Sequence, residues 1–103
     1  MTPYWHTPAH KGEEVQFRLR PLKSSEFYEI QTSMLGRRAP SWDGISAAAD
    51  CIVGWKGLPA EFSQKAVQDV LAGTVDVDWI IWLTEITGHL YSQALLPESE
   101  RKN

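Results

Sequence analysis

The sequence predicts a mainly α-helical (α+β) fold of about four helices, with a short N-terminal β-strand or a small sheet. Four segments place apolar residues at the i, i+3, i+4, i+7 spacing of an amphipathic helix. Residues 15–20 instead alternate apolar and polar side chains, which is typical of a strand. The length of 103 residues suits one domain. We therefore expect an N-terminal arm at 1–12, one globular domain at 13–97 and a charged tail at 98–103.

The arm carries two of the chain's prolines, at positions 3 and 8, and has no helical period. Proline fixes φ and donates no backbone hydrogen bond, so we expect this segment to be extended or partly disordered. Its neighbouring aromatic residues, Tyr4 and Trp5, give it side chains that can dock on its own subunit or on another one.

The first strand and the first two helices follow from periodicity and capping residues. The apolar positions of the expected strand are Val15, Phe17 and Leu19, and Pro21 ends it. Ser24 or Ser25 can cap a helix that Gly36 is placed to end. Ser41 or Asp43 can cap a second helix. The apolar face of this second helix is Ile45, Ala48, Ala49 and Ile52, with Cys51 as a small core residue beside it. Its alanines allow close approach of a neighbouring helix.

Two glycines interrupt the helical period in residues 53–59, which we expect to be a short extended turn able to pair with the 15–20 strand. Ser63 is placed to cap a third helix, and Gly73 to end it. The inward positions of this third helix are Val67, Val70 and Leu71.

The last helix, at about 79–96, is the most apolar part of the chain, with Asp76 or Asp78 as its cap and Pro97 as its stop. A polar stripe recurs every four residues along it, at Glu85, His89 and Gln93. These polar groups would each need a partner in lipid, so a membrane span is excluded. The apolar arc opposite is wider than the usual ~100°. Either part of it meets another chain, or the helix is a fully buried central helix.

Five tryptophans in 103 residues favour a binding protein, because Trp buries a large area at little rotamer cost. The candidate partner-binding residues are Trp55, Trp79, Trp82, Ile86, Tyr4 and Trp5. Among them we single out Trp55 and Trp79 as anchors, since each lies beside a turn or a helix start.

No set of residues predicts catalysis, a metal or a cofactor. His6 and His10 have the i, i+4 spacing of metal ligands, but the flanking prolines argue against a helix there. The Glu85 and His89 pair is typical of a helix surface contact, and the glycines of residues 53–59 do not form a phosphate loop. The net charge is -3, and scattered acidic residues balance the one basic cluster, so we do not expect nucleic-acid binding. That cluster is Arg18, Arg20 and Lys23 with Arg37 and Arg38. One cysteine and no signal peptide favour a reducing cytoplasm.

The order of whole segments carries a resemblance. It consists of the strand Phe-Arg-Leu-Arg-Pro-Leu (17–22), Glu-Phe-Tyr-Glu-Ile (26–30), Val-Gly-Trp-Lys-Gly-Leu (53–58) and Glu-Phe-Ser (61–63). Over about residues 13–103 this order resembles the tail assembly chaperones of long-tailed bacteriophages and prophages. The resemblance implies a small, mostly helical, non-catalytic protein without a cofactor, in the bacterial host cytoplasm. It also implies that the chain binds the tape measure protein and keeps it soluble while tail tube subunits assemble.

The resemblance extends to the end of the chain, where Arg101-Lys102-Asn103 can be encoded by the slippery heptamer A-AAA-AAC. Such families often use a ribosomal frameshift there to make a minor, extended form that recruits tail tube subunits. We therefore expect an extended product of this kind, and a homo-oligomer that hides apolar surface at rest.

Two other functions stay open from the sequence. A small structural tail or head-tail joining protein retained in the virion would need the same interface-rich domain. A cytosolic regulatory protein such as an antitoxin, which neutralises a basic partner, fits the acidic charge but lacks the long disordered tail that we would expect.

Overall fold

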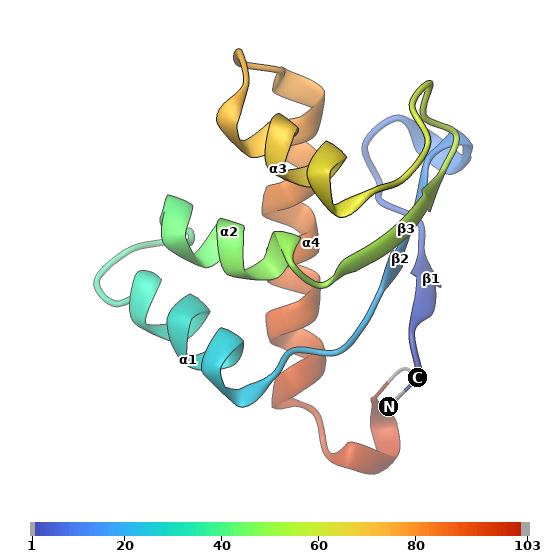
Figure 1. Cartoon of the computed structure of the whole chain (residues 1–103). Helices are drawn as coiled ribbons and strands as arrows, with labels where there is room; N and C mark the ends of the chain where they lie inside the picture. The colour runs from blue at the N-terminus through green and yellow to red at the C-terminus, as the bar shows by residue number, and fades with distance from the viewer. Residues whose placement is uncertain (1, 102–103) are drawn as a thin grey trace.

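The computed structural model describes residues 2–101 and confirms the predicted fold class, with four α-helices and a three-stranded antiparallel sheet in the described part of the chain (Figure 1). The elements in chain order are β1 (Tyr4–His6), a 3-10 turn (Gly12–Glu14), β2 (Gln16–Leu19), α1 (Ser24–Ser33), α2 (Trp42–Ala49), β3 (Ile52–Lys56), α3 (Gln64–Ala72), α4 (Val77–Leu95) and a second 3-10 turn (Glu98–Glu100). Lys102 and Asn103, on which the frameshift expectation depends, lie outside the described residues.

α4 is the centre of the fold (Figure 1). The helices α1, α2 and α3 lie across one side of it, and the sheet lies on the other side. α2 packs against both α1 and α4. Gly44 favours the close approach of α2 to α1, because a Cβ there would displace the Ser33 hydroxyl and press on the Cβ atoms of Ser33 and Pro40. The small residues expected at the packing face of this helix are there, since Ala48 and Ala49 are both buried.

The sheet has the order β1-β2-β3, with both pairings antiparallel. The expected pairing of residues 53–59 with the first strand is confirmed, with Phe17 opposite Trp55. One boundary was wrong: Ile52 begins β3 and is not the last apolar position of the second helix. That helix ends at Ala49, so Cys51 lies in the buried turn between α2 and β3.

The N-cap residues follow the sequence at three of the four helices of the described chain, and two of these residues cap through their side chains. The Ser63 hydroxyl accepts a hydrogen bond from the N–H of Ala66 at 2.9 Å, and the Asp76 carboxylate accepts bonds from the first turn of α4. α1 differs, because Lys23 precedes it and the Glu26 carboxylate accepts the Lys23 N–H at 2.8 Å. Ser41 holds the cap position of α2 without a side-chain hydrogen bond.

The core is formed where one face of α4 meets β2, β3, α1 and α2. Its fully buried large side chains include Phe17, Leu19, Ile30, Ile52, Ile86 and Leu90. α4 is buried along this face only, since Ile80 and Ile81 remain 42% and 39% exposed. The helix is therefore central but not fully buried. None of the helices in residues 2–101 is long and apolar enough to span a membrane.

The N-terminal arm covers the polar stripe of α4, so its described part belongs to the domain. The hydroxyl of Tyr4 lies 2.8 Å from His89 Nε2, and the N–H of Ala9 donates to Glu85 Oε1 at 2.9 Å. The imidazole of His6 stacks on that of His89, with ring centroids 4.1 Å apart. The arm is extended as predicted, but it is an edge strand and a covering segment of the fold.

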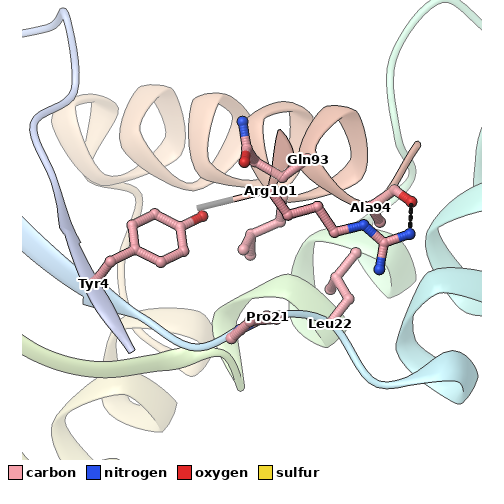
Figure 2. Close-up of a pocket in the computed structure, with 7 residues that line it drawn as sticks. Tyr4, Pro21, Leu22, Gln93, Ala94 and Arg101 are labelled. Carbon is pink, nitrogen blue, oxygen red and sulfur yellow. Dashed lines mark hydrogen bonds between the residues drawn. The ribbon is translucent and has the colours of Figure 1, made fainter. Parts of the chain in front are cut away.

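The described part of the charged tail also packs on the domain. Arg101 donates hydrogen bonds to the carbonyl oxygens of Leu96 and Ala94 at 2.8 and 2.9 Å, which satisfies carbonyl groups at the end of α4. Figure 2 shows Arg101 beside Tyr4 and Gln93, where they line a small cavity between the two ends of the chain. The sequence predicted a solvated tail, and this contact differs from it.

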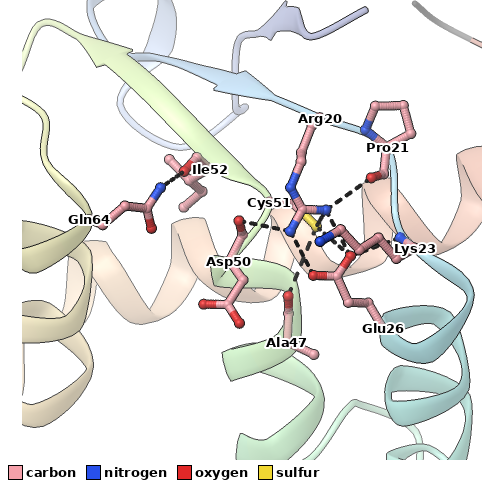
Figure 3. Close-up of polar contacts among 9 residues, drawn as sticks. All are labelled: Arg20, Pro21, Lys23, Glu26, Ala47, Asp50, Cys51, Ile52 and Gln64. Atoms are coloured by element: carbon pink, nitrogen blue, oxygen red, sulfur yellow. Dashed lines mark hydrogen bonds and ion pairs between the residues drawn. The ribbon is translucent and has the colours of Figure 1, made fainter. Parts of the chain in front are cut away.

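A polar cluster joins the start of α1 to the turn between α2 and β3 (Figure 3). Arg20 makes a two-pronged pair with Glu26, with N–O distances of 2.8 and 2.7 Å, and donates to the carbonyl of Asp50. Burial alone would raise the pKa of Glu26, but hydrogen bonds from Arg20 and the Lys23 N–H outweigh it and lower that pKa. Burial, followed by the nearby Glu26 charge, raises the pKa of Cys51 to about 12, so its thiol stays protonated.

This cluster predicts a pH-dependent stability. The pKa of Glu26 is lower in the folded chain than its ordinary 4.5, so its stabilisation is full above that value and is lost as pH falls through the folded pKa. Glu26→Gln should therefore destabilise the chain at pH 7 by about 1–3 kcal/mol, and the deficit should shrink below about pH 4.5. Urea unfolding of both proteins from pH 7 to pH 3 measures this. A deficit that does not change with pH would contradict it.

Candidate functional site

α3 buries little of its surface against the rest of the domain, and a groove lies on each side of it. Of its residues only Val67 is fully buried, although Val70 and Leu71 pack partly against the core. Most side chains of this nine-residue helix therefore remain at least partly exposed. The recesses beside α3 are lined mostly by apolar side chains.

The first recess, which we name the Trp42 groove, lies between the start of α2, α3 and the first turns of α4. Its apolar lining includes Trp42, Leu71, Val75, Trp79, Ile80 and Leu83. Three of these are large hydrophobic side chains in contact with solvent: Trp42 is 49% exposed, Val75 78% and Ile80 42%. The groove has a cavity volume of about 270 Å³, slightly below the ~300–1,000 Å³ of typical small-molecule pockets. It is therefore large enough to receive side chains of a partner.

The second recess, the Trp55 groove, lies on the other side of α3. It is lined by Trp55, Leu58, Pro59, Ala60, Ala66, Asp69, Val70 and Trp79. The ring of Trp55 is fixed, because its indole N–H donates to the carbonyl of Ala60 at 2.8 Å and its face meets Phe62 at 5.1 Å. Trp79 borders both grooves and contacts Trp55 edge to face at 5.5 Å. The two proposed anchors are thus neighbours in the structure.

The remaining candidates lie elsewhere. Trp82 and Ile86 are 5% and 0% exposed, so the structure places them in the core, where no surface partner can reach them. They share the buried face of α4 with Leu83 and Leu90, and the ring of Trp82 meets Phe17 of β2. Tyr4 and Trp5 lie on β1; Tyr4 contacts α4, whereas Trp5 is 39% exposed with the Lys56 ammonium 4.0 Å from its ring.

Sequence reasoning missed the most exposed residues of the Trp42 groove. In the sequence, Ile80 is one residue of the wide apolar arc of the last helix and Trp42 is one of five tryptophans, and neither stands out further. Val75 lies in the connection at 73–76, between Gly73, which ends α3, and Asp76, which caps α4. An apolar residue in such a short connection was the available signal, because connections normally carry polar residues.

Acidic residues border both grooves. Asp69 lines the Trp55 groove, Asp76 lines the Trp42 groove, and Asp50 lines a recess that continues from Trp42 between α2 and α3. No lysine or arginine lines these three recesses within residues 2–101. Lys65 on α3 is paired with Asp69 at 2.9 Å and is itself mostly exposed. The rim of the site is therefore negatively charged.

Reactive groups do not gather at the grooves. His6 and His10 diverge, with His6 against His89 and His10 2.7 Å from Asp78 Oδ1. No group of three or more potential metal-binding side chains forms within the described chain. The arrangement is suited to burying apolar side chains of a partner.

In comparisons with known proteins, no family model, no curated protein and no solved structure matches the chain.

Proposed function

We propose that this protein is a non-catalytic phage tail assembly chaperone, which binds the tape measure protein in the host cytoplasm and keeps it soluble. The proposal joins the segment order described above to one structural observation: exposed Trp42, Val75 and Ile80 line a single groove. A soluble chain rarely exposes neighbouring large apolar side chains without a partner for them.

The chemistry of the groove supports a holding function. A tape measure protein is a long helical chain whose apolar stripes have no core to enter. Burying a large apolar side chain contributes ~1.5–3 kcal/mol, so two or three such contacts favour binding while leaving it reversible. Release then follows when tube subunits compete for the same stripes, without a chemical energy source. At rest, a second copy of the chain can cover the groove.

Co-expression with the tape measure protein of the same gene cluster tests the proposal. We expect the soluble fraction of the tape measure protein to rise several-fold with the wild-type chain. Ile80→Ser should remove most of this effect, because it places a hydroxyl in the groove. Tyr28→Ser is the matched control, since Tyr28 is also exposed but lies on α1.

Two outcomes would contradict the proposal. The first is that the solubility of the tape measure protein does not depend on this chain. The second is that Ile80→Ser and Tyr28→Ser reduce the soluble fraction of the tape measure protein equally. Purified particles separate the chaperone from the alternative, a structural tail or head-tail joining protein, because a chaperone is absent from finished virions.

A further inference from the structure

The Trp42 groove has walls made only of helices and one helix connection. Its lining comes from α2, α3, the connection at 73–76 and α4. Within residues 2–101 no strand edge borders this groove, so an extended peptide in it would leave its own backbone N–H and C=O groups without partners. A helix satisfies these groups internally. The groove therefore fits a helix that inserts side chains spaced i, i+3, i+4 and i+7.

The charge around the groove restricts that helix further. Asp76 lies at one side of the apolar floor, and Asp50 lies beyond Trp42 on the other, in the recess that shares Trp42 and Leu71 with the groove. Asp69 lies near the Asp76 side but is paired with Lys65 at 2.9 Å, so Asp50 and Asp76 carry the argument about charge. Since no Lys or Arg lines these described recesses, a helix flanked by acidic residues would face the like charges of Asp50 and Asp76.

We infer that the Trp42 groove selects an amphipathic helix whose apolar stripe is flanked by lysine or arginine residues. This inference rests on the proposed function, which it deepens by stating the chemistry of the partner segment. The apolar stripe enters between Trp42 and Ile80, and the flanking cations approach Asp50 and Asp76. Apolar burial supplies the affinity, and the carboxylates select the sign of charge and speed the encounter.

Two synthetic helical peptides of about 20 residues test the inference. They share one Leu/Ile stripe, and one carries Lys at the flanking positions where the other carries Glu. Fluorescence anisotropy should show the Lys peptide binding about tenfold tighter at 50 mM salt, with the advantage shrinking at 500 mM because salt screens exposed charges. Equal affinity of the two peptides would overturn the charge selection.

Substitutions in the protein locate the effect. Asp50→Lys should weaken the Lys peptide about threefold or more and improve the Glu peptide. Glu29→Lys, the same change at an exposed position on α1, should alter neither affinity. Ile80→Ser should weaken both peptides together. Equal responses to Asp50→Lys and Glu29→Lys, or no response to Ile80→Ser, would show that the groove is not the binding surface.

Failure here is distinguishable from failure of the proposed function. If the tape measure protein depends on Ile80 for solubility while the two peptides bind equally well, only the inferred preference for lysine or arginine beside the apolar stripe is overturned, and the proposed function stands. Sedimentation of the protein alone is the remaining measurement. Suppose that Ile80→Ser abolishes self-association and that the peptides do not compete with self-association of the wild-type protein. The Trp42 groove is then occupied by a second copy of the chain, and the inference is overturned.

Discussion

Replacing Trp82 by alanine should destabilise the isolated chain by about 3–5 kcal/mol, the usual cost of removing a buried aromatic side chain. Trp82 is 5% exposed, and its ring meets Phe17 and Trp79 edge to face at 5.7 and 5.4 Å. Its indole N–H also donates to the carbonyl of His10 at 3.0 Å. The substitution therefore leaves both a cavity and a carbonyl without its donor. Urea unfolding measures the loss.

Trp42→Ala is the matched control, because it removes the same side chain from an exposed position. Trp42 is 49% exposed at the first position of α2, so its loss should cost less than about 1 kcal/mol. Partner binding should show the opposite pattern, because Trp42→Ala should weaken binding in the Trp42 groove while the protein stays folded. Equal destabilisation by the two substitutions would show that Trp42 is structural and would remove it from the binding surface.

The fold was predictable where local signals agree. Apolar periodicity located all four helices, and the side chains of Ser63 and Asp76 cap the helices that they were expected to cap. Boundaries failed where a residue suited two elements. Ile52 continues the helical spacing of α2, yet it begins β3, because β-branched residues pack well in strands and pairing with Leu19 is a contact distant in sequence.

The candidate site was only partly predictable. Periodicity identified a wide apolar arc on α4 but not which part of it would be covered, so Trp82 and Ile86 were grouped with Trp79. Their burial depends on β2, which precedes α4 by about 60 residues in sequence. The covering of Glu85 by Ala9 is a contact across 76 residues, and no local pattern encodes it.

Deleting residues 2–10 should destabilise the domain by at least about 3 kcal/mol, since the deletion removes several hydrogen bonds and uncovers buried apolar surface. If the arm docked on another subunit, as the sequence also allows, its deletion would weaken self-association and leave the fold intact. The structure reverses this expectation. β1 pairs with β2 through three residue pairs, and Pro8 is fully buried. Without the arm, Glu85 loses the Ala9 N–H and Trp82 loses its acceptor.

Neighbouring substitutions on β1 serve as matched controls, because alternate residues of a strand point to opposite faces. Tyr4 points toward α4, where its hydroxyl meets His89 and burial raises the pKa of the phenol to about 12. Tyr4→Ala should therefore account for a large part of the deletion effect. Trp5→Ala should cost about 0.5–1 kcal/mol, the value of an exposed cation–π contact such as that with Lys56. Urea unfolding gives these stabilities, and sedimentation at matched concentration separates them from self-association. A deleted chain that unfolds at the wild-type urea concentration, or Trp5→Ala costing more than Tyr4→Ala, would show that the arm is not part of the domain.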